Sequence, residues 1–218
     1  MVIKQVGLQS KLQILIIDKQ LAACHRETAE HEDGRILLSR FEFAQNQYVT
    51  FVPTYGVPHS MHNKPLKDQT QIDENTKLKA MRAVQDRLTS TITKAIRNNE
   101  LIYVFGDLQD TPDNSKMFHY GSSRIPKHPL GIVKTCESFN LECTIYHHCD
   151  SLEKPIISRH GSKGGRFIDG MYTSKEGLAH ITGITIISDT GIFSDHDLVI
   201  SKVDLGLEPF QISKDTEE

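Results

Sequence analysis

The chain has 218 residues, of which 38% are hydrophobic, and its formal net charge is −3 at pH 7. This length suits one domain that buries its own core, and the composition excludes a disordered or grossly basic protein. Nucleic-acid binding must therefore be local. No apolar run approaches the roughly 20 residues that span a bilayer, and residues 1–10 lack a secretory signal, so we expect an intracellular protein, or a fragment of one, with no membrane partner.

Short β-rich runs and polar connections alternate in the first part of the chain. Residues 12–17 form an apolar strand-like run, and a polar connection follows through residue 34. The β-rich runs at residues 35–43 and 47–54 are separated by three residues and predict a hairpin of antiparallel strands. Tyr55 ends the second run, and the Gly and Pro that follow it indicate a loop.

A long amphipathic helix is expected at about residues 76–98. Apolar residues recur there at intervals of three and four, at Leu78, Met81, Val84, Leu88, Ile92 and Ile96. The continuous apolar run at residues 101–105 is typical of a strand buried on both faces.

The rest of the chain belongs to the same expected unit, a partial domain over residues 1–206, which a polar tail at 207–218 follows. Residues 110–127 predict a long loop, because they are rich in Pro, Ser, Asn and Gly. A short helix is expected at residues 131–139. Strands are expected near residues 141–146, 167–173, 181–187 and 198–203.

Acidic residues stand at the ends of three strand-like runs. Asp107 follows the run at 101–105, Asp169 ends the run at 166–169, and Ser194-Asp195-His196-Asp197 separates two apolar runs. Polar side chains at strand ends can be held rigidly in one cleft. These three segments suggest a single acidic site that uses a metal ion.

Four sequence features follow one another along the chain: Tyr55, Gly-Asp-x-Gln at 106–109, Arg-x-Ile-Asp at 166–169 and Ser-Asp-His-Asp at 194–197. Their order resembles that of the endonuclease/exonuclease/phosphatase superfamily. The spacing is most similar to the nuclease modules of non-LTR retroelements and to the abasic-site endonucleases. The resemblance implies a two-sheet α/β sandwich and a metal-dependent phosphodiesterase that hydrolyses DNA. It also implies Mg²⁺ or Mn²⁺ as the cofactor and a place within a longer polyprotein or multidomain chain.

Two elements that the resemblance implies have no counterpart in this sequence. Members of the superfamily begin with a strand bearing an Asn and a second strand bearing a metal-binding Glu, whereas residues 7–17 resemble the strand that follows that Glu. We therefore expect the chain to represent the latter two-thirds or so of a domain. Weak Mg²⁺ binding and very slow or undetectable nicking of DNA are expected in consequence.

The resemblance implies a role for each residue of the acidic site. Asp107 would orient or deprotonate the attacking water, and Gln109 would replace the Asn that helps to place the phosphate and that Asp. Glutamine is one methylene longer, so its amide reaches the same partners only if the backbone adjusts. His196 would contact the scissile phosphate, with Asp169 fixing its tautomer and raising its basicity.

Two further residues complete the implied site. Asp195 would bind a metal ion or orient its bound water, and Tyr55 would donate its phenol to a phosphate oxygen. Taken singly, each residue of the implied site is better explained as a capping Asp or a Tyr at the edge of the core; taken together, these residues favour the site.

A basic, glycine-rich stretch precedes the third motif. Residues 154–166 contain Arg159, Lys163 and Arg166 among several glycines and no acid. Such a loop can follow a phosphate backbone, and we interpret it as the nucleic-acid contact, with an ordinary hairpin tip as the alternative.

Two other functions stay open. A phosphomonoesterase acting on a small or lipid phosphate would use the same site, but the basic loop favours a polymer. A catalytically inactive remnant that binds nucleic acid is favoured by the missing Glu.

Overall fold

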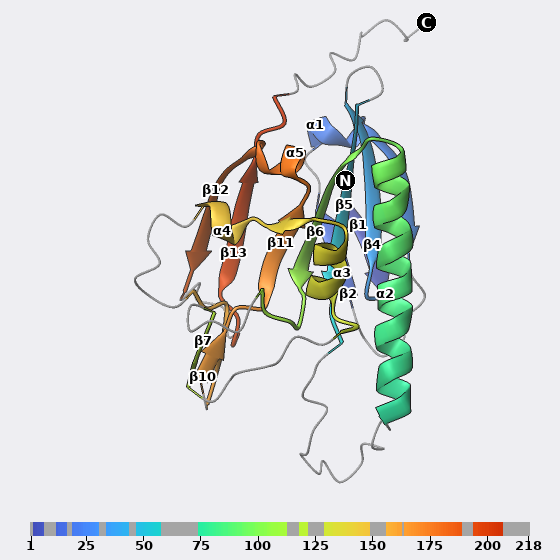
Figure 1. The fold of residues 1–218 in the computed structure, drawn as a ribbon. Helices are drawn as coiled ribbons and strands as arrows, with labels where there is room; N and C mark the ends of the chain where they lie inside the picture. The colour runs from blue at the N-terminus through green and yellow to red at the C-terminus, as the bar shows by residue number, and fades with distance from the viewer. Residues whose placement is uncertain are drawn as a thin grey trace, which may run out of the picture.

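The computed structural model describes residues 2–6, 12–16, 19–30, 34–43, 47–57, 74–112, 118–121, 129–148, 156–162, 164–188 and 194–206. Its centre is a six-stranded sheet in the order β3-β4-β5-β6-β11-β8 (Figure 1). The strands are β3 (His25–Glu30), β4 (Leu37–Phe43), β5 (Gln47–Tyr55), β6 (Leu101–Asp107), β11 (Asp169–Thr173) and β8 (Glu142–Cys143). Only β5 and β6 pair in parallel; the other neighbours are antiparallel.

A helix connects the two parallel strands and covers one face of the sheet. Parallel neighbours need a crossover, and α2 (Glu74–Arg97) supplies it. Met81, Val84, Leu88 and Ile92 of α2 are buried against Ile102 and Val104 of β6 and against α3 (Ile132–Ser138). Figure 1 shows α2 and α3 together on this face.

The opposite face of the sheet is aromatic and meets two short antiparallel pairs. Phe41, Phe43 and Tyr103 are buried there. The pairs are β12 (Ile181–Ile187) with β13 (Leu198–Val203), and β1 (Val2–Val6) with β2 (Leu12–Ile16). A groove of about 870 Å³ runs between β13, the sheet and Ile16 of β2. This arrangement confirms the expected two-sheet α/β sandwich.

Smaller elements lie around these layers. β7 (His119–Gly121), β10 (Gly164–Arg166) and β9 (Arg159–Gly161) form a three-stranded sheet in the order β7-β10-β9. The short helices are α1 (Lys19–Ala22), α4 (Ile145–His148) and α5 (Lys175–Leu178). Within the described part of the chain, no helix has the length and apolar character needed to cross a membrane.

Most expected elements are confirmed, and the differences have physical causes. The hairpin of β4 and β5, the helix α2 and the buried strand β6 follow the sequence pattern. The polar connection before residue 34 was expected to lack a strand, but it contains β3. Its polar residues suit an edge strand, and among the described strands β3 pairs with β4 alone. The strand expected at 141–146 is wrong beyond Cys143, because α4 begins at Ile145.

One glycine controls how the end of β6 packs on β5, and it gives a stability test. Gly106 has a φ of +130°, and a Cβ there would overlap the carbonyl oxygen of Thr54. We expect Gly106→Ala to lower the free energy of unfolding by about 2–4 kcal/mol, measured by urea denaturation. In the control Gly183→Ala, the added Cβ meets nothing within 4 Å. The free energy of unfolding of that variant should stay within about 0.5 kcal/mol of the parent value. Equal losses in the two variants would contradict this account.

Candidate functional site

Three adjacent strands place polar residues in one row at a single edge of the central sheet. Tyr55 is registered opposite Asp107 in the β5–β6 pair, and Asp107 is registered opposite Asp169 in the β6–β11 pair. Because β5 and β6 are parallel, both end at this edge, whereas the antiparallel β11 begins there. The expected convergence of these three residues is therefore a consequence of strand direction and register.

Backbone contacts hold the row in place just beyond the strands. The Gly56 amide donates to the Asp107 carbonyl at 2.8 Å, and the Leu108 amide donates to the Ile168 carbonyl at 2.8 Å. A Cβ on Gly56 would overlap the carbonyl oxygen of Leu108, so only glycine allows this approach. The loops that leave β5 and β6 are thus packed against each other.

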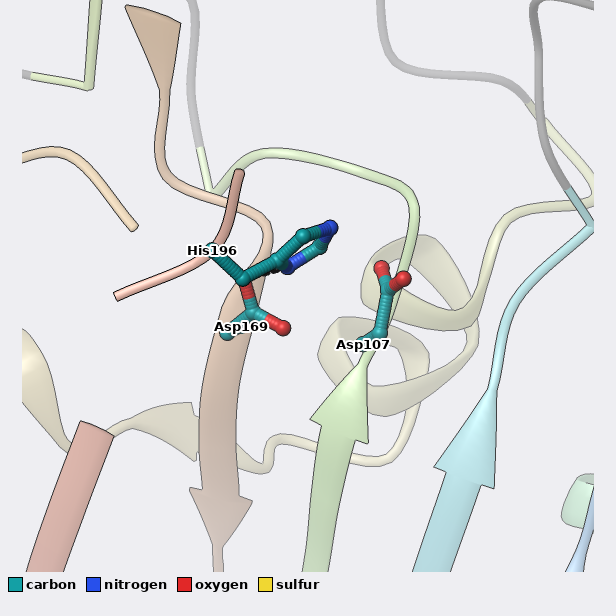
Figure 2. Close-up of side chains that lie close together, drawn as sticks. All are labelled: Asp107, Asp169 and His196. Atoms are coloured by element: carbon teal, nitrogen blue, oxygen red, sulfur yellow. Dashed lines mark hydrogen bonds and ion pairs between the residues drawn. The ribbon is translucent and has the colours of Figure 1, made fainter. Parts of the chain in front are cut away.

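His196 reaches the row from the turn before β13 and pairs with Asp169. The distance from His196 Nδ1 to Asp169 Oδ2 is 2.8 Å, which is within the hydrogen-bond reach that the expected pair required. Figure 2 shows Asp107, Asp169 and His196 around one space beyond the ends of β6 and β11. An ionised carboxylate only accepts, so Nδ1 carries the proton and Nε2 is the nitrogen left for other contacts.

The same three side chains form a group that could hold a divalent cation. One ligand atom from each of Asp107, Asp169 and His196 lies within 4.8 Å of the other two. Carboxylate oxygens suit Mg²⁺ and Mn²⁺, and an imidazole nitrogen is better tolerated by Mn²⁺. Burial, followed by the charge of Asp169, raises the pKa of Asp107 above its usual value. A bound cation would offset this repulsion, so the donor set fits the expected ion.

Gln109 supports Asp107 directly. Its Nε2 donates to Asp107 Oδ2 at 2.6 Å, and its backbone amide donates to Asp107 Oδ1 at 3.1 Å. Gln109 has a φ of 55°, so the backbone bends to bring the longer side chain back over the carboxylate. Its Oε1 is buried and has no hydrogen-bond partner among the described residues. The Gln109 side chain thus holds Asp107 through its NH₂ group, while its Oε1 stays available as an acceptor.

Tyr55 is held at the edge of the row by a buried arginine. The Arg35 guanidinium donates to the Gly56 carbonyl at 2.7 Å and lies over the Tyr55 ring at 5.3 Å from its centroid. Burial, and then the charge of Asp107, raise the pKa of the Tyr55 phenol. The phenol therefore keeps its proton at neutral pH and is available as a donor.

Asp195 lies beside the cation-holding group and contacts an arginine. Its Oδ2 accepts from Arg159 Nε at 2.8 Å, and its Oδ1 is 3.8 Å from His196 Nε2. The Arg159 side chain, through this hydrogen bond and its charge, helps to lower the pKa of Asp195 despite partial burial. Asp195 is thus ionised next to the site, and its role as a metal ligand stays a prediction.

The basic stretch forms a hairpin next to the acids. Arg159 is on β9 and Arg166 is on β10, and these strands are antiparallel; Lys163 lies outside the described residues. Arg159 is engaged by Asp195, but among the described residues no ion pair to Arg166 is found. Burial lowers the pKa of Arg166, and the nearby carboxylates of Asp107, Asp195 and Asp169 raise it. The Arg166 guanidinium is therefore close enough to interact electrostatically with the acids of the site. Of the two described arginines, Arg166 is the one available to a ligand.

Several residues of the site carry no signal in the sequence. Ser158 donates to Asp169 Oδ2 at 2.8 Å, and His160 Nε2 is 2.9 Å from Asp197 Oδ2. Arg35 lies 20 residues before the tyrosine it contacts. Each contact joins segments that only the folded sheet brings together, so motif spacing could not have found them.

Comparisons with known proteins agree with this architecture. No protein-family model and no curated protein sequence matches the chain. Solved structures do match it. The endonuclease domain of TRAS1, a telomere-specific non-LTR retrotransposon, is 16% identical with a TM-score of 0.56, and the match covers 94% of this chain and 80% of that one.

Two microbial enzymes are similar to the chain at the same level. The AP endonuclease from Archaeoglobus fulgidus is 13% identical with a TM-score of 0.58, and the match covers 83% of this chain and 72% of that one. The 3′-5′ exonuclease NExo from Neisseria meningitidis is 13% identical with a TM-score of 0.55, and the match covers 83% of this chain and 72% of that one. The chain has the endonuclease/exonuclease/phosphatase fold, as the order of its motifs predicted.

The Asp169–His196 contact makes a prediction about pH. The hydrogen bond with Asp169 is the main cause that raises the pKa of His196 above 6.5, while burial opposes it. We expect Asp169→Asn to lower this pKa, measured by NMR titration of the ring protons in metal-free protein. Because the folded pKa is raised, protonated His196 stabilises the fold below about pH 6.5, and this stabilisation is lost as the pH rises through the folded value. Asp86→Asn, on the exposed side of α2, is the control. If Asp86→Asn lowered the pKa of His196 as much as Asp169→Asn does, the assigned pair would be refuted.

Proposed function

We propose that this chain is a divalent-metal-dependent hydrolase of the DNA phosphodiester backbone, of the kind found in retroelements, and that residues 1–206 form part of its domain. The observation that supports this most is the row of Tyr55, Asp107 and Asp169 on three adjacent strand ends, with His196 paired to Asp169. A hydroxyl donor, two carboxylates and an imidazole around one space are the groups that phosphodiester hydrolysis requires.

In this proposal each side chain has one task. Water attacks phosphorus and gives its proton to the Asp107 carboxylate, and the bond from phosphorus to the leaving oxygen breaks. Gln109 holds the Asp107 carboxylate toward that water. Tyr55 donates to a non-bridging phosphate oxygen. His196 does so through Nε2 when both ring nitrogens carry a proton, while Nδ1–H stays on Asp169. The leaving oxygen takes a proton from solvent.

The carboxylates of Asp107 and Asp169, with Asp195 at the rim, are the residues that would hold Mg²⁺ or Mn²⁺. When bound, this ion offsets the negative charge that develops on the phosphoryl oxygens. We assign His196 to the phosphate and not to the ion, because its Nδ1 is engaged by Asp169 and Mg²⁺ prefers carboxylate oxygens to an imidazole nitrogen.

The hairpin of β9 and β10 would bind the DNA backbone. Arg166 is half-buried next to the acids, so its charge offsets their repulsion of phosphate. We propose Arg159 and Lys163 as further phosphate contacts, with Arg159 released from Asp195 when DNA binds. The Neisseria structure described as 3′ phosphatase NExo bound to product DNA hairpin supports DNA as the ligand class.

One observation favours phosphomonoester hydrolysis on an amphiphilic substrate as a second candidate. The groove of about 870 Å³ is lined by Asp107 and Asp169 at one end and by Phe51, Phe105 and Met171 beyond them. An apolar groove that continues from a phosphate site could take an alkyl chain. Phosphate release from hexadecyl phosphate, unaffected by competing DNA, would favour this candidate over the first.

The nicking of supercoiled plasmid tests the proposed activity. We expect slow nicking that requires Mg²⁺ or Mn²⁺, because the described donors form an incomplete oxygen shell for the ion. Asp107→Asn should lower the rate at least about 100-fold and leave the dissociation constant for DNA within about twofold, since Asp107 acts on the water. DNA binding with no nicking under any divalent ion would favour the inactive remnant. Robust nicking that persists in EDTA or in Asp107→Asn would refute the assigned site.

The hairpin variants should show the reverse behaviour. Substituting Lys163 and Arg166 by Gln should weaken DNA binding and flatten its dependence on salt concentration, because fewer counterions are released. Lys79→Gln, on an exposed position of α2, is the matched control for loss of positive charge. An equal loss of binding in Lys79→Gln would show that the hairpin has no special role.

A further inference from the structure

Ser158 lies directly before the basic hairpin and is completely buried. Its hydroxyl accepts from the backbone amides of Ile168 at 2.9 Å and Asp169 at 3.0 Å. The same hydroxyl donates to Asp169 Oδ2 at 2.8 Å. A serine hydroxyl has two lone pairs and one proton, so all three capacities are used.

This arrangement fixes the direction of the hydrogen bonds that join Ser158, Asp169 and His196. Both Ser158 lone pairs are occupied by amides, so its single proton can go only to Asp169 Oδ2. That oxygen also faces His196 Nδ1 at 2.8 Å. A carboxylate oxygen has no proton to donate, so Oδ2 accepts from Nδ1 as well as from Ser158, and the imidazole proton stays on Nδ1.

We propose that Ser158 is a positioning residue for the phosphodiester hydrolysis proposed above: through Asp169, its hydroxyl holds His196 with the proton on Nδ1 and Nε2 directed to the phosphate. The inference rests on the proposed function only for the catalytic use of His196. The hydrogen-bond geometry itself holds whether or not the chain is a nuclease.

The backbone of Ser158 extends this role to the rest of the site. Its amide donates to the Arg166 carbonyl at 3.1 Å, and its carbonyl accepts from the Asp197 amide at 2.7 Å. Ser158 thus joins β10, which carries Arg166, to the turn that carries His196 and to the start of β11. Ser158 therefore fixes the relative positions of the β9–β10 hairpin, the Asp169 carboxylate and the His196 ring.

Removing the Ser158 hydroxyl would disturb the Asp169–His196 pair in a defined way. In Ser158→Ala the amides of Ile168 and Asp169 lose their acceptor in a buried place, where an unsatisfied donor is costly. The Asp169 carboxylate accepts from the same hydroxyl that these amides bond, so we expect it to turn toward the amides and away from His196. Without its acceptor on Nδ1, the imidazole proton would no longer be confined to that nitrogen.

The test reads the tautomer of His196 in metal-free protein by ¹⁵N NMR of the imidazole, at a pH where the ring is neutral. We expect the proton on Nδ1 in the parent chain, a mixture of tautomers or mainly Nε2–H in Ser158→Ala, and restored Nδ1–H in Ser158→Thr, which keeps the hydroxyl. Ser138→Ala is the control, because its hydroxyl donates to the carbonyl of Thr135 within α3, away from the Asp169–His196 pair.

If Ser158→Ala does not fold, Ser158→Cys takes its place, since a thiol is a weaker donor and acceptor and should give a smaller change in the same direction. A folded Ala or Cys variant that keeps Nδ1–H as fully as the parent would overturn the proposal. In the nicking assay, Ser158→Ala should lower kcat about 10- to 100-fold and leave DNA affinity within about twofold. If no variant nicks DNA, the tautomer measurement still decides the positioning role, so its failure is distinguishable from that of the proposed function.

Discussion

The backbone register of β6 with its two neighbours is the constraint on which the rest of the site depends. Tyr55, Asp107 and Asp169 come together because β5 runs parallel and β11 antiparallel to β6 with these residues directly opposite. A slip of one residue would move every side chain of a strand to the other face of the sheet. The buried residues of β6, Ile102 and Val104 against α2 and Tyr103 on the aromatic face, prevent such a slip. Packing of the core therefore determines the geometry of the site.

Three of the acids at this edge have a basic side chain as their partner. Asp169 meets His196, Asp195 meets Arg159, and Asp197 meets His160. Asp107 has no cationic partner among the described residues that form ion pairs, and its pKa is raised by burial and by Asp169. A carboxylate kept in such a place costs stability, and sites of this kind are retained where a ligand uses the charge. The unbalanced charge of Asp107 is thus consistent with a cation or a proton as its partner in function.

Much of the fold and of the candidate site could be predicted from the sequence, because both depend on periodic apolar patterns. The run before Asp107 and the spacing in α2 determine a buried strand and its crossover helix, and the carboxylates follow at the strand ends. Other features have no such signal. β3 is polar because it is an edge strand, and Ile96 is half exposed because Ala95 faces the core in its place. Ser158 is one serine in a polar stretch, and its importance comes from antiparallel pairing that brings it to Asp169.

The central claim is that the edge formed by β5, β6 and β11 binds a divalent ion, and paramagnetic line broadening tests it most directly. With substoichiometric Mn²⁺ added to ¹⁵N-labelled protein, the amide signals of Tyr55, Asp107, Asp169 and His196 should lose intensity first, and Asp107→Asn should weaken the effect. Signals from the middle of α2 should persist. Broadening centred instead on the exposed pair of Glu142 and His147, or spread evenly over the chain, would contradict the account.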